Sequence, residues 1–263
     1  MSTYDLPDEL QVRDDGPVRV ITLNRPGQLN AANHDLHRGL AALFPQLDAD
    51  DEARAAVITG AGRAFSAGGD FTYIDELSKD ASLRSVTLAH GRQIVTGMVG
   101  CRVPIVAAVN GPAVGLGCSL VALSDIVFMA ESAHLADPHV LLGLVAADGG
   151  PVVWPMLTSL QLAKEYALTG ERISAQRGAE IGLVNHVCPD DEVLDRAMAC
   201  AHKIARLPRG AVEDTKRIIN IQMERAVLAA LDFALTAEDR SFTTPELRAN
   251  IDRMLAPKDD TAR

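Results

Sequence analysis

The segment from Pro104 to Ala130, PIVAAVNGPAVGLGCSLVALSDIVFMA, restricts the fold more than any other part of the chain. Short apolar runs at 105–109 and 126–129 are typical of strands that are buried on both faces. Between them a glycine-rich turn leads into a uniformly apolar run at 116–123, which predicts a buried helix. The segment therefore predicts a strand, a glycine turn, a buried helix and a second strand within an α/β fold.

The turn in this segment contains Gly111, Gly115 and Gly117. A turn that enters a helix directs unpaired backbone N–H groups into the space above the strand ends, where they can hold an oxygen that gains negative charge. Glycine also permits a tight turn without any ligand nearby. Taken alone, the turn is therefore compatible with a binding role or with packing.

A second turn of the same kind follows the apolar run at 56–59 and has the sequence GAGRAFSAGGD at 60–70. Gly68 and Gly69 precede Asp70, a residue whose side chain can cap a helix. Backbone donors from two separate loops can converge on one oxygen, which is the geometry of an oxyanion hole. The two turns together favour such a site.

The segments AVITGAGRAFSAGGD (56–70) and PIVAAVNGPAVGLGCSL (104–120) resemble the two signature segments of the crotonase superfamily, also called the enoyl-CoA hydratase/isomerase family. ALTGERISAQRGAEIGLVNHV (167–187) extends the resemblance over nearly the whole chain. The resemblance implies that the N–H groups of Gly69 and Leu116 form the oxyanion hole. It also implies an acyl-CoA substrate, with coenzyme A entering as part of the substrate, no permanently bound cofactor and no metal.

Further substrate contacts follow from the same resemblance. The family's first motif, matched by LNRPGQLNA at 23–31, packs near the adenine end of CoA. The implied substrate or CoA contacts are Leu29, Ala67, Asp70, Phe71, Thr72 and Gly115. The aromatic rings of Phe71 and Tyr73 could pack the loop, contact an acyl chain, or do both.

The chain departs from the hydratases at their two catalytic glutamates, because the matching positions hold Ser119 and His139. His139 is followed by Asp148 in PHVLLGLVAADGGPVVWP (138–155), and a histidine beside an acid can be fixed in one tautomer and made a better base for water. We therefore predict that His139, oriented by Asp148, is catalytic. Asp137, Ser119 and His37 are three further candidates for the site.

Both catalytic candidates also have structural interpretations. Asp148 precedes two glycines and could cap the helix predicted from about Gly149, while His139 could be an ordinary hydrogen-bonded residue after Asp137-Pro138. His34 is expected to be solvated or to cap the helix that begins near Asn33.

The histidine and aspartate together resemble the branch that includes 6-oxocamphor hydrolase, a β-diketone cleaver. That enzyme has a histidine where this chain has Leu116, and one of its site histidines matches His37. Three functions therefore remain open: hydration of an enoyl-CoA, hydrolysis of a C–C bond in a β-diketone or β-ketoacyl-CoA, and CoA binding without catalysis.

Composition excludes several other classes of protein. The 25 basic residues against 35 acidic residues give a net charge of −10, which argues against a nucleic-acid surface. The four cysteines, at 101, 118, 188 and 200, lack the spacing of a metal site or a redox motif. The acidic start of the chain does not look like a signal peptide, and no apolar run is long enough to cross a bilayer, so we expect a soluble cytoplasmic protein.

Recurring strand, turn and helix patterns predict stacked ββα units, arranged as a superhelix, over residues 1–190, which would hold the CoA and active sites. After Pro189 the pattern becomes helical, with helices predicted at 191–206, 211–236 and 245–255 and a charged tail after them. Residues 191–263 are therefore predicted to form a helical region whose apolar faces need a cover. The resemblance implies that self-association supplies it, in a homotrimer or a hexamer made of two trimers.

Overall fold

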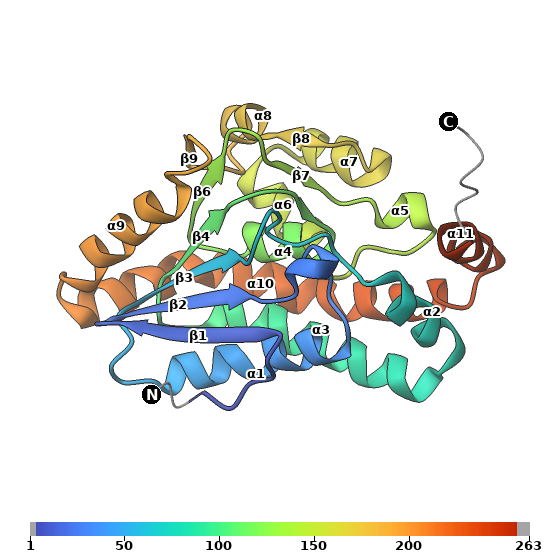
Figure 1. Cartoon of the computed structure of the whole chain (residues 1–263), viewed down its shortest axis with the longest axis horizontal. Helices are drawn as coiled ribbons and strands as arrows, with labels where there is room; N and C mark the ends of the chain where they lie inside the picture. Colours follow the sequence, from blue (N-terminus) through green and yellow to red (C-terminus); the bar gives the residue numbers. More distant parts are fainter. Residues whose placement is uncertain (1–3, 257–263) are drawn as a thin grey trace.

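A computed structural model describes residues 4–256, so the predicted charged tail after 256 lies outside the described residues. Six strands form the main sheet in the order β1-β2-β3-β4-β6-β9 (Figure 1). The β1–β2 pair is antiparallel and the remaining pairs are parallel. The strands are β1 (Leu10–Asp15), β2 (Val18–Leu23), β3 (Ala55–Gly60), β4 (Ile105–Val109), β6 (Ile126–Ala130) and β9 (His186–Cys188).

The two glycine turns start from neighbouring strands of this sheet. β3 and β4 pair in parallel and are entirely buried, in agreement with their apolar sequences. Asn110, which follows β4, accepts a hydrogen bond from the N–H of Gly60 at 3.1 Å and donates one back to its carbonyl at 3.0 Å. Parallel pairing therefore brings both turns to the same edge of the sheet.

A second sheet consists of β5 (Ala113–Val114), β7 (His134–Ala136) and β8 (Ile173–Ser174). Isolated bridges between Ser66 and Ala113 and between Ala32 and Gly69 continue it on one side. Successive parts of the chain thus place a strand in each sheet and then a helix, as in β4, β5 and α4 (Leu116–Ala122). The predicted α/β fold of stacked ββα units is confirmed.

The helices near the turns begin where polar side chains cap them. Asn33 accepts a hydrogen bond from the N–H of Leu36 at 3.0 Å and starts α1 (His34–Ala49). Asp70 caps α2 (Phe71–Lys79) in the same way, and α3 (Ala81–Gly100) follows directly. The helix α4 is buried along its whole length, as its apolar sequence predicts.

Short helices make up much of the later part of the body. They are α5 (His139–Leu142), α6 (Gly150–Leu157), α7 (Leu160–Thr169) and α8 (Ala175–Glu180), while the 3₁₀ turn η1 (Pro26–Gln28) lies in the first motif. The start of α5 places His139 immediately after β7 and Asp137. Local chain order therefore positions two of the candidate side chains beside each other.

The C-terminal helices pack on the body of their own chain. α9 (Val193–Ala205) contacts β3, β4 and β6, α10 (Arg209–Ser241) packs against α3 and α6, and α11 (Pro245–Leu255) contacts α2 and α5. The long α10 crosses most of the width of the molecule, with α11 beside α2 and α5 at one end (Figure 1). Part of the apolar surface that was expected to be covered by self-association is thus covered within one chain.

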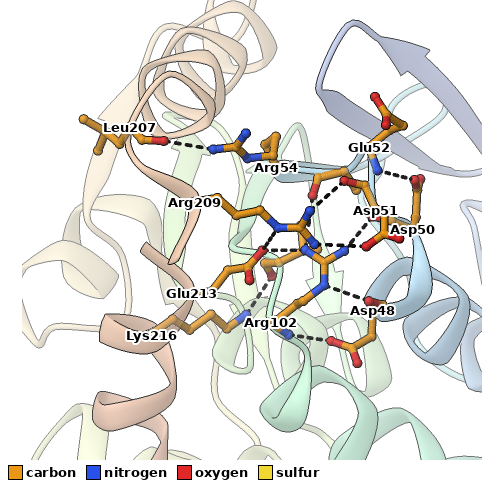
Figure 2. Close-up of polar contacts among 12 residues, drawn as sticks. Asp48, Asp50, Asp51, Glu52, Arg54, Arg102, Leu207, Arg209, Glu213 and Lys216 are labelled. Atoms are coloured by element: carbon orange, nitrogen blue, oxygen red, sulfur yellow. Dashed lines mark hydrogen bonds and ion pairs between the residues drawn. The ribbon is translucent and has the colours of Figure 1, made fainter. Parts of the chain in front are cut away.

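Polar contacts hold the N-terminal end of α10 against the body (Figure 2). Arg102, after α3, forms an ion pair with Glu213 of α10 at 2.5 Å, and its backbone N–H donates to Asp48 of α1 at 2.8 Å. Lys216 is buried and donates to the carbonyl of Val103 at 2.9 Å. These contacts fix where the rest of α10 lies relative to the sheet.

Within residues 4–256, no helix is both long and apolar enough to cross a membrane.

Candidate functional site

A cavity of about 290 Å³ lies at the edge where the two glycine turns meet. Its walls come from α1, α2, α3, both turns, α5, α10 and α11. The cavity therefore crosses the boundary at residue 190, although the whole site was expected before that residue. Eight of the candidate residues line it: His37, Ala67, Gly69, Phe71, Gly115, Leu116, His139 and Asp148.

Backbone hydrogen bonds hold the loops around the cavity in register. The N–H of Val114 donates to the carbonyl of Ser66 at 2.9 Å, which joins the two turns. The N–H of Gly115 donates to the carbonyl of Ala136 at 2.9 Å, which joins the second turn to β7. The position of each turn is thus set by the other turn and by the strand that leads to His139.

The two predicted oxyanion donors both lie at the cavity. Gly69 and Leu116 line it, and neither backbone N–H donates a hydrogen bond to another group within residues 4–256. Most buried backbone N–H groups are hydrogen-bonded, so two free donors in one cavity are unusual. They can hold an oxygen that gains negative charge.

Gly115 allows the second turn to approach His139. Its φ of +52° and ψ of −120° belong to a region that L-residues rarely adopt. A Cβ at this position would lie 3.4 Å from Cε1 of His139 and 3.6 Å from Cα of Gly68. Glycine is therefore favoured here by the backbone conformation, whereas a Cβ would only be in van der Waals contact with the imidazole.

His139 lies between two carboxylates. Its Nδ1 is hydrogen-bonded to Oδ1 of Asp137, and its Nε2 lies 3.3 Å from Oδ2 of Asp148. The orienting role was predicted for Asp148, but the nitrogen that faces away from the cavity is held by Asp137, which is fully buried. Asp148 instead faces Nε2, the nitrogen on the side of the cavity.

The capping interpretation of Asp148 is wrong. The N-cap of α6 is Gly149, in a left-handed conformation, and no side chain caps this helix. The carboxylate of Asp148 is turned toward His139, because a hydrogen bond to an imidazolium is stronger than one to a neutral amide. The proximity of His139 and Asp148, nine residues apart in the chain, agrees with the pairing expected from the sequence.

The charges of these groups depend on one another. Burial alone lowers the pKa of His139, but the carboxylates of Asp137 and Asp148 outweigh burial and hold this pKa well above its ordinary value. Burial raises the pKa of Asp148, and the hydrogen bond and charge of His139 more than offset this effect and lower it. The two carboxyl groups therefore favour the imidazolium form of His139.

Glu238 of α10 is a site residue that was not expected from the sequence. It is 7% exposed and lines the cavity, and its carboxyl lies near His139 and Asp148, with one ligand atom from each within 4.8 Å of the others. Burial, followed by the nearby charge of Asp148, raises the pKa of Glu238 to about 8. Glu238 is therefore mostly protonated at pH 7 and can donate a proton.

The spacing of His139, Asp148 and Glu238 would also suit a metal ion, and this is the one such group within residues 4–256. An imidazolium and a protonated carboxyl are not metal ligands, so a metal would have to displace two protons here. The arrangement of charges is better suited to proton transfer.

Two of the further candidates have clear places. Ser119 is buried behind the cavity, and its Oγ accepts a hydrogen bond from the N–H of Gly150 at 3.3 Å, so it helps to hold the start of α6. His37 lines the cavity, and burial lowers its pKa to about 4, so it is neutral at pH 7. His34 is not a cap, because Asn33 has that role, and its Nδ1 is hydrogen-bonded to the hydroxyl of Tyr73 at 3.2 Å.

Three predicted CoA contacts do not line the cavity. The carbonyl of Leu29 accepts a hydrogen bond from the N–H of Ala67 at 2.9 Å, which places Leu29 behind the first turn. Asp70 forms an ion pair with Arg25 at 3.1 Å, and Thr72 is exposed in the first turn of α2. Any contact of these residues with the CoA part of a substrate remains a prediction.

Comparisons with known proteins agree with this architecture. A family model described as enoyl-CoA hydratase/isomerase matches residues 13–255. The mitochondrial enoyl-CoA hydratase of Pongo abelii is 34% identical over 218 residues, which cover 83% of this chain and 71% of that protein. The short-chain-enoyl-CoA hydratase of Clostridium acetobutylicum is 32% identical over 233 residues, which cover 88% of each.

A solved structure shows the same fold. An enoyl-CoA hydratase/isomerase from Mycobacterium paratuberculosis superimposes with a TM-score of 0.93 at 65% sequence identity, covering 95% of this chain and 100% of that chain. The resemblance first seen in the two glycine turns therefore extends to nearly every element of the fold. This protein belongs to the enoyl-CoA hydratase/isomerase family, and thus to the crotonase superfamily.

Proposed function

We propose that this protein adds water to an enoyl-CoA thioester. The thioester oxygen would lie between the backbone N–H groups of Gly69 and Leu116, which stabilise the negative charge of an enolate better than that of the ground-state carbonyl. One observation supports this most directly. The two backbone N–H groups without partners lie at the same cavity as His139, Asp148 and a protonated Glu238.

The side chains around His139 would supply and remove protons. Asp137, His139 and Asp148 together carry one net negative charge and can accept one proton from water through Asp148. The water oxygen then bonds to the β-carbon, and the π electrons move to the thioester oxygen. Glu238 gives its proton to the α-carbon, and the proton held by Asp148 returns to Glu238, which restores the starting state.

A second reaction fits the same groups. If the substrate carries a β-keto group, activated water would attack that carbonyl, the bond between the α- and β-carbons would break, and the released carbon would become an enolate between the same two amides. The replacement of the two hydratase glutamates by Ser119 and His139 favours this alternative. Both reactions need one activated water and one stabilised enolate.

One experiment separates the two reactions. The protein would be incubated with an enoyl-CoA, a β-ketoacyl-CoA and a cyclic β-diketone in H₂¹⁸O, and the products weighed by mass spectrometry. Hydration gives a product that has gained one labelled water and kept its carbon skeleton. Hydrolysis gives a labelled acid and a broken carbon skeleton. A protein that changes none of the three compounds would contradict both proposals.

A third possibility is a protein that binds CoA without catalysis. Such a protein would bind an acyl-CoA and show no turnover, whereas an enzyme would show turnover that depends on His139 and Asp148. His139→Ala and Asp148→Asn should reduce turnover at least about 100-fold and leave the affinity for a saturated acyl-CoA nearly unchanged. If both variants convert substrate at the wild-type rate, the acid–base roles of these residues are wrong.

We further propose that the chain forms a trimer or a pair of trimers. Apolar side chains on α10 remain exposed in the single chain, including Ile218, Ile219, Leu228 and Phe233. Light scattering of the purified protein tests this, and a monomer at micromolar concentration would overturn it. The division into a body of residues 1–190 and an assembly region of 191–263 depends on the same result.

A further inference from the structure

Arg84 is a buried cation in the wall of the cavity that the proposed reaction does not use. Four residues of α3, namely Arg84, Thr87, Leu88 and Gly91, line the cavity, and their spacing places them on one face of the helix. Arg84 is 7% exposed. Arginine is seldom so deeply buried unless its charge and its donors have partners.

The partners of Arg84 account for only part of its guanidinium. Its Nε donates to Oδ1 of Asp239 at 2.7 Å, and its Nη1 donates to the carbonyl of Leu77 at 2.7 Å. A guanidinium has five N–H donors, and Nη2 has no hydrogen-bond partner within residues 4–256. Two N–H groups of Nη2 and one of Nη1 are therefore left for a ligand.

The surroundings of these free donors are apolar. Arg84 lies over the ring of Phe242, 6.0 Å from its centroid, and the neighbouring wall includes Ile74, Leu77 and Leu144. In such surroundings an unpaired N–H is costly, whereas a hydrogen bond to an anion is strong. The free edge of a guanidinium matches a carboxylate, which can accept two parallel hydrogen bonds from it.

We propose that Arg84 binds a carboxylate carried by the acyl group, at a distance from the thioester carbonyl. The preferred substrates are then CoA thioesters of dicarboxylic acids, a specificity that depends on the proposed acyl-CoA chemistry. A purely structural arginine would need only the contacts with Asp239 and Leu77. A specificity for carboxylates explains why the remaining N–H donors of Arg84 have no partner and why they lie in the cavity wall.

The test compares the binding of saturated acyl-CoAs, which cannot be hydrated. Calorimetry would measure three pairs of equal chain length: glutaryl-CoA with pentanoyl-CoA, adipyl-CoA with hexanoyl-CoA, and suberyl-CoA with octanoyl-CoA. We expect the wild-type protein to bind the carboxylated member of at least one pair at least tenfold more tightly. Arg84→Gln should remove this preference and keep the affinity for the methyl-ended partner.

Asp239→Asn is the matched control, because it removes the ion-pair partner of Arg84 and leaves the guanidinium in place. This variant should keep the preference for the carboxylated ligand. Thermal unfolding shows whether each variant is folded, and if Arg84→Gln is not, equal affinities within every wild-type pair would still overturn the role of Arg84.

The outcomes separate this inference from the proposed function. Equal affinity within all three pairs in the wild-type protein would overturn the role of Arg84 and leave acyl-CoA chemistry intact. A preference that persists in folded Arg84→Gln would also overturn it. If the protein binds none of the six thioesters, the proposed function fails, and the specificity fails with it.

Discussion

Nε2 of His139 lies 3.3 Å from Oδ2 of Asp148, although one residue begins α5 and the other precedes α6. On the opposite side of the ring, Asp137 is hydrogen-bonded to Nδ1. The imidazole therefore has one carboxylate that is buried and one that faces the cavity. This asymmetry leads to different expectations for the two aspartates.

Asp148→Asn should reduce kcat about 100- to 1,000-fold, because the group would lose its proton acceptor at the cavity. Asp137→Asn should reduce kcat less than this, since the ring would lose the group that orients it and part of the charge that raises its pKa, while Asp148 would still face the cavity. KM should change little in either variant. Steady-state kinetics with crotonyl-CoA measures this, with Asp195→Asn on the exposed face of α9 as a control that keeps wild-type kcat. A larger loss in Asp137→Asn than in Asp148→Asn would reverse the assigned roles.

The raised pKa of Glu238 predicts a pH dependence of activity. Because the proton of Glu238 is required, kcat/KM should fall about tenfold for each step of one in pH above about pH 8. Glu238→Gln should be at least about 100-fold slower and should lack this alkaline limb. A pH–rate profile of both proteins measures the effect. An alkaline limb that survives in Glu238→Gln must come from another group.

The same pKa affects stability with a definite sign. The pKa of Glu238 is about 8 in the folded protein and about 4.5 when unfolded, so the native state binds more protons between these values. The contribution of Glu238 therefore becomes less favourable as pH rises from about 4.5 to about 8. Urea unfolding should show Glu238→Gln gaining stability over wild type across this range, with a slope of about 1.4 kcal/mol for each step of one in pH. A difference that stays constant with pH would contradict the raised pKa.

Gly115→Ala should damage both stability and turnover. The alanine would have to adopt a strained backbone conformation, at a cost of about 1–3 kcal/mol, and relief of this strain would shift the turn that carries the N–H of Leu116 and contacts His139. Denaturant unfolding and kinetics measure the two effects. Gly210→Ala is the matched control, because nothing lies within 4 Å of its Cβ and it is in the first turn of α10. This control should be neutral or slightly stabilising.

Lys216→Met should destabilise the attachment of α10 to the sheet. Lys216 forms an ion pair with Asp125 at 2.7 Å, and both groups are largely shielded from water. Removing one partner leaves the other poorly compensated, so we expect a loss of about 2–4 kcal/mol in unfolding free energy. The exposed pair of Arg196 and Glu192 provides a control, and Arg196→Gln should cost less than about 1 kcal/mol. Equal effects in the two variants would contradict the importance of burial.

Much of the fold could be predicted from local patterns. The apolar run at 105–109 coincides with β4, and the helix predicted at 245–255 coincides with α11. The cap at Asn33 and the buried face of α1 also follow from the sequence, because capping and amphipathic spacing act over a few residues. The two glycine turns could be found because their residues are contiguous.

Glu238 was missed for a physical reason. The predicted helix ended at 236, whereas α10 continues to Ser241, because Ala237 to Arg240 are compatible with a helix and the chain stops only near Thr243 and Pro245. On a charged surface such a glutamate would be unremarkable. Only the packing of α10 against α3 and α6 brings it to His139, ninety-nine residues away in sequence, and single-sequence patterns contain no signal for this contact.

The contact of Asp137 with Nδ1 was missed because both Asp137 and Asp148 were expected near His139. Which aspartate contacts Nδ1 and which contacts Nε2 depends on the direction in which the imidazole leaves α5. That direction is set by the backbone of β7 and the second turn. Proximity could be predicted, but the side of the ring could not.

Because α10 supplies a wall of the cavity, the order of synthesis has a consequence for the cell. A nascent polypeptide that has emerged only through α9 already contains both glycine turns and His139, yet it has neither Glu238 nor the surface that encloses Arg84. The ribosome must release the last quarter of the protein before the walls of the cavity can be complete. Closure of the cavity therefore depends on the segment of the chain that is synthesised last.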